Sequence, residues 1–132
     1  MMADIFSDQW MQNLMQQWNN EPELASDLAN IGFNSTIAYG FENEDEPRAV
    51  LVIKKGKAVA AQGFNDETFH WDLRASKEDW KKWFSKPPGM MGVGMAYTSQ
   101  QLKFNKGDYT SMIKDPRMAA PFLKSFVVMA RV

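Results

Sequence analysis

The stretch Arg48-Ala-Val-Leu-Val-Ile-Lys-Lys-Gly-Lys-Ala-Val-Ala-Ala-Gln-Gly-Phe64 decides the fold. Its first part, over 48–53, is a run of apolar residues that predicts a well-buried strand. Gly56 lies in the tight turn over 54–57, where it can take a positive φ. The chain then returns over 58–64 as the partner strand. The sequence therefore predicts an antiparallel pair around which a sheet can form.

Two further strands are predicted by alternation of apolar with small or polar residues, one before this pair and one after it. They cover 34–41 and 68–74. Their inward faces are Ile37, Tyr39 and Phe41 in the first and Phe69, Trp71 and Leu73 in the second. A fifth, short strand is predicted over 101–105. Because the first four strands follow one another through short turns, we expect an antiparallel meander with helices covering one face.

Two helices are predicted before the strands. Ser7 can cap the first, whose apolar residues over 10–18 form one stripe. Pro22 suits the first turn of the second helix, and Gly32 can end it.

More helical structure is predicted after the fourth strand. Ser76 and Asp79 have the spacing of a capping box, which predicts a helix over 77–85. A helical tail continues to the end of the chain, with a kink or restart at Pro121. The segment 90–97 is apolar, unbranched and rich in glycine, and its pattern favours neither helix nor strand.

The composition is that of one folded domain. The chain has 132 residues, of which 45% are hydrophobic and 13% aromatic, which is enough for a core. We expect a single α+β domain over 1–132, with a helical N-terminus over 7–31 and sheet and helices over 33–132. The absence of cysteine excludes disulfides, thiolate metal sites and thiol nucleophiles. The lone histidine, His70, excludes a multi-histidine site within one chain, so no metal is expected.

Nothing in the sequence predicts export or membrane insertion. The first 30 residues are acidic and lack the basic start and apolar run of a signal peptide. No stretch approaches the roughly 20 apolar residues of a membrane span. We therefore expect a cytoplasmic protein of bacterial type.

The two parts of the chain carry opposite charge. Residues 1–76 hold 5 basic and 12 acidic side chains, whereas residues 77–132 hold 10 basic and 4 acidic ones. The basic residues are scattered among aromatic and methionine residues instead of forming the dense patch of a nucleic-acid binder. We therefore expect no nucleic acid as partner, but transient contact with an anionic membrane or a partner enzyme.

The sharpest polar cluster is His70, Asp72 and Arg74, which project from one face of a strand at steps of about 7 Å. In a functional interpretation, His70 is a general base oriented by Asp72, and Arg74 holds an anion. In the commoner structural interpretation, the three lie on a solvated outer face with an ion pair. No nucleophile motif accompanies the cluster, so we assign no catalytic residue.

The string Gly89-Met-Met-Gly92-Val-Gly94 has the glycine content of a phosphate-binding loop. It lacks the Lys-Ser/Thr pair that follows a nucleotide P-loop, and it does not follow a predicted strand. Glycines that ease close packing around a bend explain the string better. No cofactor is therefore expected.

The most unusual feature is the presence of ten methionines, six of which lie in the basic part of the chain. Methionine recurs at apolar surfaces that accept varied partners, although a methionine-rich core explains the composition equally well. These methionines are interleaved with aromatic residues in a segment broken by glycine and proline, which favours an adaptable binding wall. The candidate ligand-binding residues are Trp80, Trp83, Phe84, Met90, Met91, Met95, Tyr97, Phe104, Met112, Phe122, Phe126 and Met129.

The order of elements and several local strings resemble the sterol carrier protein type 2 family of lipid-transfer domains. The strings are Trp18-Asn-Asn-Glu-Pro-Glu-Leu24, Val50–Val59, Trp71-Asp-Leu-Arg-Ala-Ser-Lys-Glu-Asp-Trp80, and Gln101-Leu-Lys-Phe104 with Lys106-Gly-Asp108. The similarity spans most of residues 7–130. It implies a curved, mostly antiparallel five-stranded sheet covered by helices around an apolar tunnel. It also implies binding of fatty acyl chains, acyl-CoA, sterols or similar lipids by a domain that is not an enzyme by itself.

We therefore expect non-catalytic binding and transfer or presentation of an apolar ligand. Burying about a dozen methylenes at ~0.8 kcal/mol each contributes on the order of 10 kcal/mol before association costs. Such binding needs hardly any polar contact, so a carrier leaves no catalytic motif in its sequence. Two alternatives stay open: a small hydratase or isomerase that uses His70 and Asp72, and an accessory subunit of a lipid- or hydrocarbon-metabolising enzyme.

A sealed tunnel must open for its ligand. We expect the gate at Pro87–Met95 and in the chain beyond Pro116, where proline, glycine and methionine make an adaptable wall. The basic residues expected around its mouth are Lys81, Lys82, Lys86, Lys114, Arg117 and Lys124.

Overall fold

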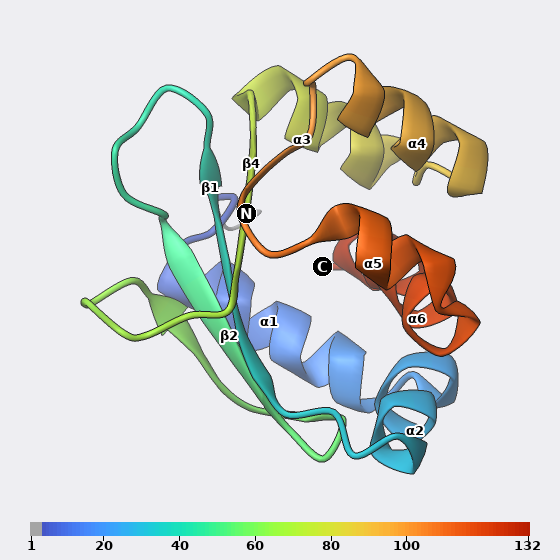
Figure 1. Ribbon diagram of the computed structural model, residues 1–132. Coiled ribbons are helices and arrows are strands. Elements are labelled where there is room, and N and C mark those ends of the chain that lie inside the picture. Colours follow the sequence, from blue (N-terminus) through green and yellow to red (C-terminus); the bar gives the residue numbers. More distant parts are fainter. Residues whose placement is uncertain (1–3) are drawn as a thin grey trace.

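The computed structural model describes residues 4–132, which form one open five-stranded sheet and six helices (Figure 1). In chain order the elements are α1 (Asp8–Asn19), α2 (Pro22–Asn30), β1 (Ser35–Phe41), β2 (Ala49–Lys54), β3 (Lys57–Gly63), β4 (Trp71–Ala75), α3 (Lys77–Ser85), α4 (Met90–Thr98), β5 (Lys103–Lys106), α5 (Tyr109–Lys114) and α6 (Pro116–Met129). Residues 1–3 of the predicted domain lie outside the described residues. Within the described part of the chain, no helix combines the length and the apolar character that crossing a membrane requires.

The strands are arranged in the order β3-β2-β1-β4-β5, and three of the four neighbouring pairs are antiparallel. The α+β class and the mostly antiparallel sheet are therefore confirmed. The expected meander is wrong at its fourth strand, because β4 pairs in parallel with β1 instead of joining β3. This register sets Ile37 beside Trp71 and Tyr39 beside Leu73, so the apolar faces of the two strands become one surface.

Two local predictions are corrected by the structure, and one unassigned segment is found to be a helix. Phe69 precedes β4 instead of lying within it, and its ring makes an edge contact with Phe64. The fifth strand covers Lys103–Lys106, two residues later than its predicted start. The unassigned segment forms helix α4, which buries Val93 and Ala96. Its pattern gave no signal because apolar residues occur all round this helix.

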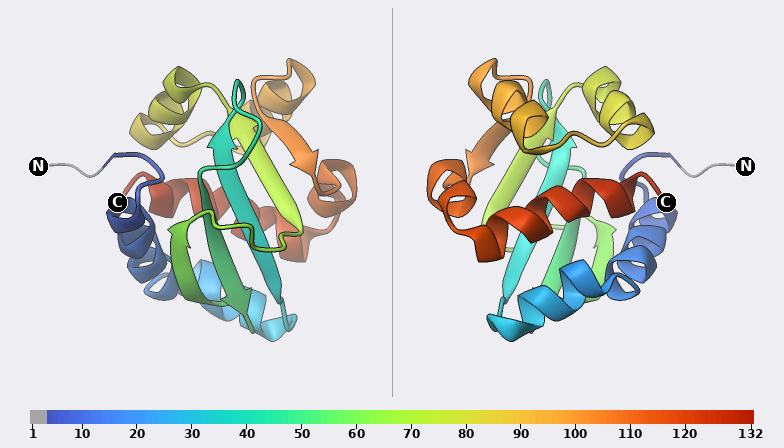
Figure 2. Two further views of the ribbon diagram at one scale, coloured as in Figure 1. Left: turned by 90° about the vertical axis from the view of Figure 1, so that its left-hand side faces the viewer. Right: turned by 90° about the vertical axis from the view of Figure 1, so that its right-hand side faces the viewer.

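The helices lie on one side of the sheet, where α6 runs across its inner face (Figure 2). The indole ring of Trp80, from α3, lies 6.4 Å from the ring of Phe126, from α6, and is completely buried. Its N–H donates to the carbonyl oxygen of Gly40 in β1 at 2.9 Å. The expectation that helices cover one face of the sheet is thus confirmed for α3 and α6. Helix α6 continues through Pro121 as one element, so the tail does not restart there.

Helices α1 and α2 are fixed to the turn between β2 and β3. The indole N–H of Trp18 donates to the carbonyl oxygen of Gly56 at 2.9 Å, and the amide of Gly56 donates to the carbonyl oxygen of Phe33 at 3.0 Å. Gly56 has a φ of +82°, and a Cβ there would collide with the backbone of Ala25 and Ala29. This turn therefore requires glycine for its conformation and for the close approach of α2.

Gly56→Ala should lower the free energy of unfolding by roughly 3 kcal/mol, because the methyl group needs both a strained φ and space that α2 occupies. Gly32→Ala is the matched control, since Gly32 also has a positive φ but open space at its Cβ position. The control should cost about 1 kcal/mol. Urea denaturation measures both values, and equal losses would contradict the close packing of α2 on this turn.

Candidate functional site

A small apolar cavity of about 50 Å³ lies between the inner face of the sheet and helices α2, α5 and α6. The resemblance to lipid-transfer domains implies an apolar tunnel in such a fold. The residues that line the cavity are Trp18, Leu24, Leu28, Phe33, Ile37, Tyr39, Trp71, Leu73, Met112, Met118, Pro121, Phe122 and Ser125.

The walls of the cavity follow from the periodicity of the elements that form them. Ile37 and Tyr39 of β1 are two residues apart and therefore face the same side, as do their register partners in β4. Leu24 and Leu28 are one turn apart on α2, and Met118 and Phe122 are one turn apart on α6. Strand and helix periods thus bring one apolar face of each element to the cavity.

The cavity wall carries no charged side chain. Its hydroxyl groups belong to Tyr39 and Ser125. The Ser125 hydroxyl donates to the carbonyl oxygen of Phe122 within α6, and burial raises the pKa of the Tyr39 phenol. Tyr39 therefore stays neutral at physiological pH. The site can hold an apolar molecule by dispersion and water exclusion, with at most a hydrogen bond at one end.

The volume of the cavity is small compared with that of a long apolar molecule. Pockets for organic ligands typically measure about 300–1,000 Å³, whereas this space holds roughly one or two waters. Occupation therefore requires the wall to move outward. Pro121 has no N–H, so the carbonyl of Arg117 has no helical partner and the first turns of α6 are held less strongly. Met112 and Met118 supply unbranched side chains that can rearrange.

Two ion pairs join the helices that flank the cavity. Glu21, the N-cap of α2, lies 2.9 Å from a guanidinium nitrogen of Arg131, and Glu23 lies 2.6 Å from the Nζ atom of Lys124. The hydrogen bond from Arg131 is the main reason that the pKa of Glu21 lies below its ordinary value of 4.5. The pairs join the start of α2 to α6 and to the residues that follow it.

Of the twelve predicted ligand-binding residues, Met112 and Phe122 line the cavity. Four lie in the core around Trp80 and outside the lining, namely Trp80, Trp83, Phe126 and Met129. Phe84 lines a separate surface groove with Trp10 and Lys81. Tyr97 and Phe104 form an aromatic cluster with Tyr109 beside the cavity, and Phe104 lies 6.0 Å from Phe122. Met90, Met91 and Met95 are exposed. The cavity wall includes none of these ten residues, and ligand contact by them stays a prediction from the sequence alone.

Most of the wall comes from residues that the sequence analysis placed in the core or did not single out. Those in the first part of the chain are Trp18, Leu24, Leu28, Phe33, Ile37 and Tyr39. Their apolar periodicity was visible, but periodicity alone does not say which buried faces leave a gap between them. The gate segment after Pro116 contributes to the wall, whereas no residue of Pro87–Met95 does.

The basic residues expected around a mouth do not form one ring of free charges. Lys124 is paired with Glu23, and Arg117 is paired with Asp115 at 3.0 Å. Lys81 borders the separate groove. The structure therefore does not show the expected ring of free basic residues around the cavity at Lys81, Arg117 and Lys124.

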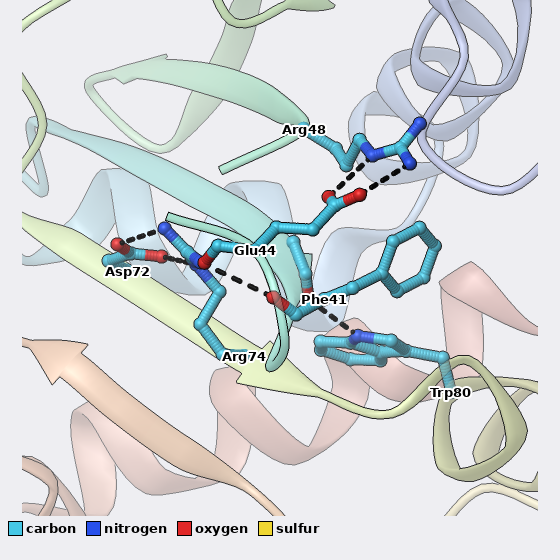
Figure 3. Close-up of polar contacts among 7 residues, drawn as sticks. Phe41, Glu44, Arg48, Asp72, Arg74 and Trp80 are labelled. Carbon is cyan, nitrogen blue, oxygen red and sulfur yellow. Dashed lines mark hydrogen bonds and ion pairs between the residues drawn. The ribbon is translucent and has the colours of Figure 1, made fainter. Parts of the chain in front are cut away.

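The polar cluster on β4 is a buried structural pair. Both carboxylate oxygens of Asp72 accept hydrogen bonds from the guanidinium of Arg74, at 2.6 and 3.0 Å (Figure 3). Arg74 also donates to the carbonyl oxygen of Glu44 at 2.7 Å, and both members of the pair are less than 5% exposed. The expected solvated face is therefore wrong here, because the β1–β2 loop covers the pair. His70 is exposed, and its Nδ1 accepts from the amide of Thr36.

Arg74→Met should lower the free energy of unfolding by roughly 3–5 kcal/mol, because it leaves the carboxylate of Asp72 buried without its partner. Arg48→Met is the matched control, since Arg48 also forms a two-bond pair, with Glu44, but is largely exposed. It should cost at most about 1 kcal/mol. Urea denaturation measures both, and a small loss for Arg74→Met would contradict the burial of this pair.

Arg131→Gln should raise the pKa of Glu21 toward 4.5, because it removes the charged guanidinium that stabilises the carboxylate. A depressed pKa stabilises the fold above the ordinary value of this carboxyl and loses that contribution as the pH falls through the folded value. Carboxyl NMR titration measures the shift, with Lys124→Gln as a control of smaller effect. An unchanged pKa of Glu21 in Arg131→Gln would show that the pair does not form in solution.

No family model and no curated protein matches the sequence. Three solved structures are similar in fold. A crystal structure of sterol carrier protein 2 has a TM-score of 0.75 and 15% identity, covering 98% of this chain and 99% of the other. A solution structure of a conserved hypothetical protein from Thermus thermophilus, described as possibly a sterol carrier protein, has a TM-score of 0.68 and 13% identity over 98% and 90% of the two chains.

The third structure is described as the UbiJ-SCP2 ubiquinone synthesis protein. Its TM-score is 0.57 at 10% identity, with coverage of 92% of this chain and 88% of the other. The chain therefore has a sterol carrier protein 2-like fold, as its sequence strings suggested.

Proposed function

We propose that this protein binds a lipid-like apolar molecule between the inner face of its sheet and helices α2 and α6, and transfers or presents it unchanged. The uncharged cavity at this position is the observation that carries the proposal. The likeness to sterol carrier protein 2 supports it, since the similar proteins cover nearly the whole chain.

The wall chemistry favours an alkyl or polycyclic apolar ligand over a polar metabolite. A polar molecule would lose its hydration against aromatic and aliphatic side chains without compensating hydrogen bonds. Each methylene transferred from water contributes about 0.8 kcal/mol, so chain length governs affinity more than any single polar contact. The hydroxyls of Tyr39 and Ser125 can accommodate one polar end.

We also propose that the bound ligand is not chemically changed. Among the residues that line the cavity, Tyr39 is the one titratable group, and its raised pKa keeps the phenol protonated, so it is not available as a general base at neutral pH. The carboxylate of Asp72, which the hydratase alternative needs, has both oxygens bonded to Arg74. These contacts favour a carrier.

The direct test is to extract the purified protein with organic solvent and identify the extracted molecules by mass spectrometry. The proposal predicts a long-chain or polycyclic apolar molecule near one equivalent per chain. When that molecule is returned to the stripped protein and incubated, its mass should not change. Failure to retain either a cellular lipid or an added fluorescent fatty acid would overturn binding, and a changed mass would overturn the carrier role.

Ser125→Val should weaken fatty acid binding about tenfold or more while leaving the fold intact or more stable. The added methyl groups occupy the cavity and replace a hydroxyl whose partner, the carbonyl of Phe122, still accepts the helical bond. Ser99→Val is the matched control, because the Ser99 hydroxyl makes the same three-residue bond, to Ala96, at the end of α4. Fluorescent displacement measures affinity, and unchanged affinity in folded Ser125→Val would contradict the assigned cavity.

A further inference from the structure

Helix α4 presents an apolar face that no other part of the described chain covers. Met90, Met91 and Met95 are 49%, 80% and 68% exposed, while Val93 and Ala96 on the opposite side are buried. Over its nine residues the helix carries no charged side chain. Exposed apolar groups that gather on one element, instead of being scattered, mark a contact surface.

Strong exposure of methionine is confined to α4 in the described part of the chain. Met11, Met112 and Met129 are buried, so methionine in this chain is not exposed by default. Among the described residues, Val59 on β3 is the one other large hydrophobic side chain that is strongly exposed. Helix α4 lies at the periphery, at the end of the molecule opposite α2, in every view (Figures 1 and 2).

The surroundings of α4 in the chain are basic. Residues 77–106 contain six lysines and two acidic residues. Lys82 in the last turn of α3 and Lys86, its C-cap, are exposed and lie one helical turn apart. Neither forms an ion pair within the described residues. An apolar face with unpaired lysines shortly before it in the chain complements an anionic lipid surface.

Helix α4 is linked to the wall of the candidate cavity through a cluster of aromatic rings. The ring of Tyr97 stacks on that of Tyr109 with centroids 4.0 Å apart, and α5, which begins at Tyr109, supplies Met112 to the lining. Phe104 contacts the rings of Tyr97, Tyr109 and Phe122. A displacement of α4 at a surface would therefore act on the helices that must move for ligand entry.

We propose that α4 is a membrane-docking helix, which inserts Met90, Met91 and Met95 among the headgroups of an anionic phospholipid bilayer while Lys82 and Lys86 bind the phosphates. The proposal rests on the proposed function, because it identifies where the carried molecule enters and leaves. A fluid bilayer suits unbranched, polarizable methionine side chains, which impose no fixed shape on their partner. The lack of polar groups on this face gives a folded protein partner little to recognise by hydrogen bonding.

The test is flotation of the protein with vesicles of phosphatidylcholine alone or with phosphatidylglycerol added. The wild-type chain should bind the anionic vesicles only, and added salt should weaken this binding, since screening limits the lysine contribution. Met91→Ser with Met95→Ser should lower the partition coefficient about tenfold or more. Lys82→Gln with Lys86→Gln should lower it by a similar factor and reduce its dependence on salt.

Matched controls use the same chemistry on another part of the surface. Val59→Ser removes an exposed apolar group from β3, and Lys54→Gln with Lys55→Gln removes two exposed lysines from the β2–β3 turn. Both should bind anionic vesicles like the wild type. All variants should keep the wild-type melting temperature, because the substituted side chains are exposed.

The outcomes separate this proposal from the proposed function. The Met91→Ser, Met95→Ser variant should bind a fluorescent fatty acid in solution as the wild type does, but exchange it with anionic vesicles more slowly. If the protein binds vesicles but neither retains nor takes up an apolar ligand, the docking surface is upheld and the carrier role is overturned. Absent vesicle binding by the wild type, or binding unaffected by the methionine variant, would overturn the docking helix. So would light scattering that shows a dimer in the wild type and a monomer in this variant, since a second copy would then cover the face.

Discussion

The parallel pairing of β1 with β4 is the constraint on which the rest of the structure depends. It sets the apolar faces of the two strands side by side and thereby creates the surface that the helices cover. The same register puts Arg74 beside Gly40, under the β1–β2 loop, where its guanidinium binds Asp72 and two backbone carbonyls. The Gly40 carbonyl in turn accepts from Trp80, so α3 is fixed to the same point of the sheet. One strand pair thus positions the loop, the aromatic core and the cavity wall.

The elements that could be predicted from the sequence are those whose signal is local. The β2–β3 pair follows from a buried run around Gly56, and α3 follows from a capping serine and its spacing to Asp79. The place of β4 could not be predicted, because strand order is decided by contacts between Ile37 and Trp71 that are far apart in the chain. The sequence of α4 shows no helical periodicity, because apolar residues occur on all sides of this helix.

The sequence predicted the chemistry of the candidate site better than it predicted the position of the site. An uncharged, adaptable wall was expected, and Met112 and Phe122 are part of it. The opposite wall, which includes Leu24 and Leu28, belongs to a helix whose apolar face looked like ordinary core. Whether apolar faces meet in contact or leave a gap depends on side-chain packing in three dimensions. The burial of Arg74 could not be predicted for a related reason. The alternation of residues along a strand does not show whether a loop covers that strand.

The central claim is that an apolar molecule occupies the space between the sheet and helices α2 and α6. The methyl groups of the eight methionines in the described part of the chain report on it directly, because they lie at the cavity wall, in or against the core, and on α4. In ¹³C-methyl NMR spectra, titration with a long-chain fatty acid should shift the signals of Met112 and Met118 most and leave that of Met11 nearly unchanged. Shifts confined to Met90, Met91 and Met95, or no shifts at all, would contradict the account.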